Sequence, residues 1–156
     1  MADPSTLTGR ENYFEDFEVG AVYKHARGKT VTNLENVLLT NLVMNTAQGH
    51  FNEHMMSATA WGAVVSYGGV NFSLVLGLAS QDCVENAVVE LGLDNIRLLK
   101  PVVHGDTLYA YSEVLAKEEG TVEGAGEVVF RHYGVNQRDE LVAQMERRAL
   151  IKRRGA

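Results

Sequence analysis

The chain has 156 residues, and 46% of them are hydrophobic, which is enough apolar material for one domain with a core of its own. Its 20 acidic and 14 basic side chains give a formal charge of −6, so we expect neither nucleic acid nor an anionic membrane surface among its partners. The single cysteine, Cys83, cannot form an intramolecular disulfide, and a reducing cytoplasm fits this composition best.

The N-terminal segment carries charges rather than an apolar run. Residues 1–20 lack the hydrophobic stretch of a signal peptide, so no export signal is expected. The most apolar stretch, residues 61–80, is interrupted by four glycines and does not suit a transmembrane helix. We expect a flexible arm over residues 1–12 and a single domain over residues 13–156.

Two helices are expected in the first half of the chain. Thr32 and Glu35 have the spacing of a capping box, and apolar residues follow at helical spacing, which predicts an amphipathic helix over residues 33–44. Residues 67–79 form a second helical pattern with apolar side chains on almost every side. Such a helix has to be wrapped by other elements, so we expect it to be the buried, central one.

The second half of the chain has the pattern of β-strands. Turn-forming residues separate five candidate strands, at residues 84–90, 95–100, 107–117, 126–136 and 140–152, and residues 23–32 add one more before the first helix. Consecutive strands joined by short turns pair antiparallel. The expected fold class is therefore α+β, a long, curved antiparallel sheet wrapped around one central hydrophobic helix, which is the hot dog fold.

Four segments of the sequence carry a family resemblance. They read Tyr-Phe-Glu-Asp-Phe-Glu-Val-Gly at residues 13–20, Asn45-x-x-x-x-His50, Trp-Gly-x-x-Val-Ser-Tyr-Gly at residues 61–68, and Ile-Arg-Leu-Leu-Lys-Pro-Val at residues 96–102 with Gly-Asp-Thr-Leu at residues 105–108. Their order and spacing resemble the MaoC-like dehydratases, the (R)-specific 2-enoyl-CoA hydratases of the hot dog superfamily. The opening segment and Met-Asn-Thr at residues 44–46 are similar to the mesaconyl-CoA and β-methylmalyl-CoA hydratase subgroup.

The resemblance implies a hydro-lyase. Its reaction would be the reversible hydration of a 2-enoyl-CoA, or dehydration of the 3-hydroxyacyl-CoA, with a branched or dicarboxylic acyl group such as mesaconyl as a candidate. Coenzyme A would enter as part of the thioester substrate, with no other cofactor. The family also implies a homodimer or higher homo-oligomer with the acyl pocket at the subunit interface, and the open edges of a single sheet independently favour edge-to-edge pairing.

The resemblance also assigns catalytic roles. In the family an Asp, and a His five positions later, hold the water that adds to the double bond. His50 matches this histidine, whereas Asn45 stands in the position of the Asp. An amide cannot accept the proton, so we expect His50 to act as base and acid in turn, and Asn45 to orient the water through its carbonyl oxygen.

Gly68 matches the position at which the family places the backbone amide that binds the thioester oxygen. It falls in the first turn of the helix predicted over residues 67–79, where unpaired N–H groups and the positive end of the helix dipole favour an oxyanion. Ser66, Tyr67 and Trp61 are candidates for pocket residues, and Tyr67 replaces the His or Asn that the family has before this glycine.

His50 and His54 are four positions apart, a spacing that zinc sites also use. No glutamate follows His50 as in the His-Glu-x-x-His motif, and the sequence offers no third ligand beside them, so we expect no metal. Hydration is therefore expected with neither a metal nor a redox cofactor.

Two other functions stay open at this point. A hot dog thioesterase would share the fold but normally uses a carboxylate near the start of the central helix, and no Asp or Glu lies between Val65 and Gly77. A non-catalytic acyl-CoA-binding homologue is the other, because residues 45, 48 and 52 all depart from the family motif. Four basic residues are either contacts for CoA phosphates or a substrate carboxylate, or ordinary surface charges: Arg27, Lys29, Arg97 and Lys100.

Overall fold

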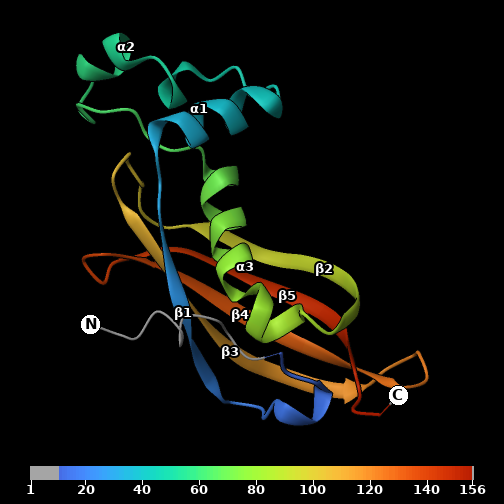
Figure 1. The fold of residues 1–156 in the computed structure, drawn as a ribbon. Helices are drawn as coiled ribbons and strands as arrows, with labels where there is room; N and C mark the ends of the chain where they lie inside the picture. The colour runs from blue at the N-terminus through green and yellow to red at the C-terminus, as the bar shows by residue number, and fades with distance from the viewer. Residues whose placement is uncertain (1–10, 156) are drawn as a thin grey trace.

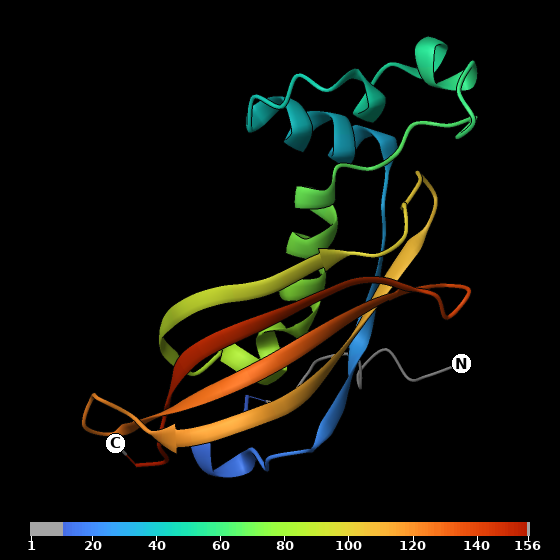
Figure 2. The same ribbon diagram turned by 180° about the vertical axis from the view of Figure 1, so that it is seen from behind.

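The structure, a computed structural model, describes residues 11–155 and consists of one sheet and one long helix (Figure 1). The sheet is antiparallel and has the strand order β1-β3-β4-β5-β2. Its strands are β1 (Val22–Thr30), β2 (Ala87–Leu98), β3 (Thr107–Glu119), β4 (Ala125–Asn136) and β5 (Leu141–Lys152). Helix α3 (Gly68–Val84) lies across one face of the sheet (Figures 1 and 2), which confirms the predicted fold class. Residues 1–10 of the predicted arm lie outside the described part.

Helix α3 is central, as predicted, but it is buried on one face only. Its buried apolar residues recur every four or five positions against the sheet: Val70, Val75, Ala79 and Cys83. Ser73 and Gly77 on the opposite side are exposed. The expected wrapping of this helix on all sides is therefore not achieved within one chain.

The core fills the space between α3 and the inner face of the sheet. One group centres on Phe17 and Phe130, whose rings meet edge to face with centroids 5.0 Å apart. A second group surrounds Val75, at the middle of α3. Strand β4 approaches the helix so closely here that a Cβ on Gly134 would clash with Val75 Cγ2. The glycine thus sets how close helix and sheet come.

The predicted turn at residues 92–94 is wrong, and β2 is a single long strand where two short ones were expected. Gly92 and Asn95 interrupt the pairing with β5 instead of reversing the chain, since the register shifts between Glu90 and Gly92 and again before Arg97. Asn95 takes a left-handed conformation, with φ of 51°, and its amide donates to Glu146 Oε2 (2.7 Å). The turn-forming residues produce bulges within a continuous strand.

Helix α1 (Asn33–Leu42) forms where an amphipathic helix was predicted, and Thr32 caps it by accepting the Glu35 N–H (3.3 Å). Its polar side is the buried one. Asn36 and Thr40 are fully buried, whereas the apolar face is open, with Leu34 77% and Leu42 67% exposed. Helix α1 therefore anchors itself to its own chain through polar contacts and presents leucines outward.

Residues 33–57, here called the overhang, extend beyond the end of the sheet next to the first turn of α3 (Figures 1 and 2). The overhang contains α1, the short 3-10 helix η3 (Gln48–His50) and α2 (Glu53–Ser57). It brings His50 to the N-terminal end of the central helix. None of the helices in residues 11–155 has the length and apolar character needed to cross a membrane.

Candidate active site

His50 ends the helix η3, and its ring is oriented by a backbone carbonyl. Its Nδ1 lies 2.8 Å from the carbonyl oxygen of Val65. Because a carbonyl oxygen can only accept, the neutral imidazole carries its proton on Nδ1 and a lone pair on Nε2. His50 therefore offers a base at Nε2. His54, four residues on, belongs to a separate helix, α2.

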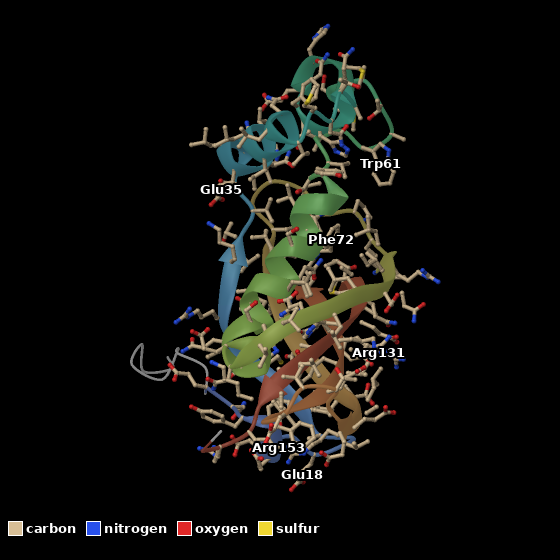
Figure 3. The ribbon with its side chains drawn as sticks, turned by 90° about the vertical axis from the view of Figure 1, so that its right-hand side faces the viewer. Glu18, Glu35, Trp61, Phe72, Arg131 and Arg153 are labelled. Carbon is tan, nitrogen blue, oxygen red and sulfur yellow. The ribbon has the colours of Figure 1, made fainter. Side chains whose placement is uncertain are left out.

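A cavity of about 290 Å³, here called the His50 cavity, opens where the overhang meets the start of α3. Its walls come from the overhang, from the loop after α2, from the first turn of α3, and from residues 98–101, the first of which ends the edge strand β2. It brings together four of the predicted site residues: His50, Trp61, Ser66 and Gly68. Trp61 projects from the loop after α2 and is 61% exposed (Figure 3).

Gly68 is the first residue of α3, with Tyr67 as its N-cap. N–H groups in the first turn of a helix have no carbonyl partner within the helix, and the positive end of the helix dipole lies there. A Cβ on Gly68 would lie close against Leu98 Cδ1, a side chain of the same cavity. The absence of a side chain on Gly68 thus leaves room at the first turn of α3, where the predicted oxyanion role requires it. That role stays a prediction.

The two remaining predicted residues lie beside the His50 cavity. Tyr67 lines a neighbouring cavity of about 240 Å³, and its ring centroid is 5.4 Å from that of His50. Asn45 is outside the residues that line either cavity, and its Oδ1 accepts the backbone N–H of Ala47 (2.9 Å). A carbonyl oxygen has a second lone pair for a water, so the proposed orienting role of Asn45 stays a prediction.

Sequence reasoning missed two buried amides at the site. Asn36 donates to the carbonyl of His50 (2.8 Å) and accepts the backbone N–H of Tyr67 (2.9 Å). Asn71 lines the His50 cavity and accepts the hydroxyl proton of Ser66 (2.7 Å). The available signal for Asn36 was a polar pair, Asn36 and Thr40, at helical spacing, but the apolar residues beside it dominated the prediction.

Lys100 places a positive charge at the rim of the His50 cavity. Its Nζ is paired with Glu140 Oε1 at 2.8 Å, and about half of its side chain is exposed. Hydrogen bonds from Lys100, Asn136 and Arg138 lower the pKa of Glu140 to about 2, so this carboxylate stays charged. An anionic substrate group would compete with Glu140 for Lys100.

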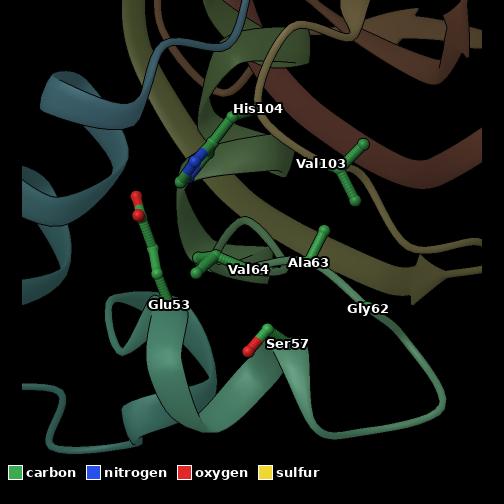
Figure 4. Close-up of a pocket in the computed structure, with 7 residues that line it drawn as sticks. All are labelled: Glu53, Ser57, Gly62, Ala63, Val64, Val103 and His104. Carbon is green, nitrogen blue, oxygen red and sulfur yellow. The ribbon is translucent and has the colours of Figure 1, made fainter.

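A further cavity, of about 360 Å³, lies between α2, the loop after α2 that carries Val64, and the loop between β2 and β3 (Figure 4). The Glu53 carboxylate and the His104 ring face each other across it (Figure 4). Burial lowers the pKa of His104, and the negative charge of Glu53 opposes this effect only in part. His104 is therefore neutral at physiological pH.

One group of side chains within residues 11–155 offers three candidate metal ligands: His25, Cys83 and His132, with ligand atoms within 4.8 Å of one another. The Ser112 hydroxyl lies 2.6 Å from His25 Nε2 and 2.6 Å from His132 Nδ1, while Asp82 Oδ2 lies 2.6 Å from His25 Nδ1. Burial raises the pKa of the Cys83 thiol to about 12, so in the absence of a metal this thiol is protonated at neutral pH. These groups make a hydrogen-bonded chain whose central hydroxyl fills the space between the two rings.

A curved antiparallel sheet around a central helix is the hot dog fold, and the solved structures that share it with this chain include MaoC-like proteins. One of them is the putative MaoC domain protein dehydratase of Chloroflexus aurantiacus, with a TM-score of 0.86 and 29% identity over 94% of this chain and 46% of that one. A second is a Mycobacterium tuberculosis protein described as having a double hot dog fold, with a TM-score of 0.83 and 21% identity over 92% of this chain and 45% of that one. The latter likeness shows the fold alone.

The chain belongs to the mesaconyl-CoA hydratase family, whose model matches residues 5–153, and the resemblance seen in the sequence is thus confirmed. It is 37% identical over 109 residues to the β-methylmalyl-CoA dehydratase of Chloroflexus aurantiacus, covering 70% of this chain and 31% of that protein. It is 32% identical over 164 residues to the mesaconyl-CoA hydratase of Haloarcula marismortui, covering 98% of this chain and 45% of that protein. The chain spans less than half the length of these relatives.

Proposed function

We propose that this chain is a hydro-lyase that adds water reversibly to the double bond of a 2-enoyl-CoA thioester. One observation carries the proposal: the His50 cavity holds both an imidazole with a free Nε2 and the first turn of α3, which begins at Gly68. The first can transfer protons, and the second can bind an enolate oxygen. Hydration of an α,β-unsaturated thioester needs these two functions.

The reaction follows from these positions. His50 Nε2 takes a proton from water, and the water oxygen adds to C3 of the acyl group. The electrons of the double bond move to the thioester, whose oxygen becomes negative and accepts the Gly68 N–H. The imidazolium then returns a proton to C2, which completes the addition of H and OH. The Val65 carbonyl holds Nδ1–H in both protonation states, so the ring keeps its orientation.

A branched or dicarboxylic acyl group is the proposed substrate class, as the names of the relatives suggest. Lys100 at the rim of the His50 cavity supports this choice, because a second carboxylate on the acyl group could bind there. The test is incubation of purified protein with crotonyl-CoA, mesaconyl-CoA and itaconyl-CoA, following loss of the conjugated absorbance. Turnover of none of them would contradict the proposed activity.

The same experiment separates the two alternative functions. A thioesterase would release free CoA, which a thiol reagent detects, but the first turn of α3 contains no acidic residue to activate water. A non-catalytic homologue would bind acyl-CoA without changing its absorbance. Neither alternative uses the free Nε2 of His50, so hydration is the function that the geometry favours.

We further propose that the chain works as a homodimer paired along β2. Strand β2 is an edge of the sheet, and it carries partly exposed apolar side chains: Val88, Val89, Leu91, Leu93 and Leu98. Both edges carry charged side chains, but the other edge, β1, has a single exposed large apolar side chain, Val22. The double hot dog protein of Mycobacterium tuberculosis is about twice this length, which supports a second copy of this chain as the partner.

A further inference from the structure

Asn36 is a fully buried amide at the centre of the overhang. Its side chain contacts the end of η3, the residue before α3 and the loop between β2 and β3, through His50, Tyr67 and His104. An amide buried this deeply is stable only when its donors and acceptor are paired. All three atoms that can form hydrogen bonds, Oδ1 and the two protons on Nδ2, have a partner here.

The orientation of this amide follows from its backbone partners. The N–H of Tyr67 can only donate, so the side-chain atom 2.9 Å from it is the oxygen, Oδ1. The carbonyl of His50 can only accept, so the atom 2.8 Å from it is the nitrogen, Nδ2. Oδ1 and Nδ2 of this one planar amide therefore hold the backbone N–H of Tyr67 and the backbone carbonyl of His50.

The second proton on Nδ2 fixes the state of His104. Nδ2 lies 3.0 Å from His104 Nε2, and because an amide nitrogen only donates, Nε2 must hold a lone pair. The proton of the neutral His104 ring is then on Nδ1. This ring faces Glu53 (Figure 4). Asn36 thus selects one tautomer of His104.

We propose that Asn36 is a positioning residue for the hydration reaction, an inference that rests on the proposed function. It joins the backbone of His50, the acid and base, to that of Tyr67, which directly precedes Gly68. The amide therefore sets the distance between the proton-transfer ring and the oxyanion N–H. Asn36 is outside the residues that line the His50 cavity, so it acts through these two partners.

Asn36 bridges the His50 carbonyl and the Tyr67 N–H, and two substitutions separate the effects of these two contacts. Asn36→Ala removes both contacts, and we expect kcat to fall about 100-fold, the usual effect of misplacing catalytic groups by about 1 Å, with KM changed less than about 3-fold. Asn36→Asp keeps an acceptor for Tyr67 but has no proton for the His50 carbonyl, so a smaller loss of about 10-fold is expected. Asn86→Ala, which removes a partly buried amide just beyond the far end of α3, is the matched control and should keep the wild-type kcat.

A kcat of Asn36→Ala equal to that of the wild type, with or without a higher KM, would overturn the positioning role. A second measurement needs no variant and no turnover: ¹⁵N NMR of the wild-type histidines reports which ring nitrogen of His104 is protonated. Protonation at Nδ1 supports the bridge, and protonation at Nε2 overturns it. A wild type inert on every enoyl-CoA, yet with His104 protonated at Nδ1, would overturn the hydratase function and support the bridge.

Discussion

His50 owes its orientation to a backbone carbonyl rather than to a carboxylate. A partner carboxylate would add a negative charge that stabilises the imidazolium, whereas the Val65 carbonyl fixes the tautomer with only its dipole. A neutral partner keeps the ring able to release its proton to C2. The geometry therefore suits a histidine that has to act as a base in one step and as an acid in the next.

Replacing His50 tests this role directly. His50→Ala should lower kcat by about 10² to 10⁴, the usual contribution of a positioned acid or base, as measured by enoyl-CoA hydration. His54→Ala is the matched control, because His54 is exposed on α2 and lines no part of the His50 cavity. Turnover of His50→Ala at the wild-type rate would show that another group transfers the proton.

Asn45 distinguishes an active hydratase from a disabled relative. If its carbonyl oxygen orients water, Asn45→Ala should lose about 10- to 100-fold in kcat, the equivalent of one hydrogen bond of about 1.5–3 kcal/mol. Asn45→Asp retains an oxygen for the Ala47 N–H, so it should stay folded and keep substantial activity with a shifted pH profile. An inert wild type whose Asn45→Asp variant gains activity would identify a disabled enzyme.

The sequence pointed to most of the site but not to what holds it in place. His50, Gly68, Ser66 and Trp61 were found because motif and helix position agree on them, and the structure gathers them around one cavity. Asn36 was missed because its role depends on contacts with residues 14 to 68 positions away in the chain. Local spacing carries no information about such contacts.

At the scale of elements, sequence periodicity predicted the type and order of the main elements more reliably than their number, their boundaries or their buried face. The helix at residues 33–42 was predicted as amphipathic, over residues 33–44, but periodicity alone does not say which side of a helix is buried in its own chain. Strand β2 was divided at Gly92 because glycine suits both a turn and a bulge. Pairing with β5 decided between them.

The close contact between α3 and β4 gives a test of packing. Gly134→Ala would place a methyl group in a clash with Val75 Cγ2, so the helix must shift, at a cost of about 1–3 kcal/mol in the free energy of unfolding. Thermal unfolding should show a lower Tm. Gly77→Ala is the control. Gly77 lies in α3, the helix that carries Val75, with open space around it, so the substitution should raise Tm slightly because alanine favours helix. An unchanged Tm for Gly134→Ala would contradict the close packing.

For the whole molecule, the central prediction is assembly. Light scattering at micromolar concentration should give the mass of two chains, and Leu93→Lys on β2 should shift it toward one, because a charge on the pairing edge opposes strand pairing. Val22→Lys on β1 introduces the same charge at the other edge and should leave the dimer intact. A wild type with the mass of a single chain would refute the β2 pairing.

One wall of the His50 cavity is continuous with the edge strand, since Leu98 is the last residue of β2 and residues 99–101 follow it directly. In a dimer paired along β2, the position of that wall depends on the partner. Thermodynamic reciprocity then requires that whatever strengthens subunit association through this wall also strengthens acyl-CoA binding, by the same factor in each direction. The substrate would act as an assembly effector, and dilution would weaken affinity before it abolished turnover.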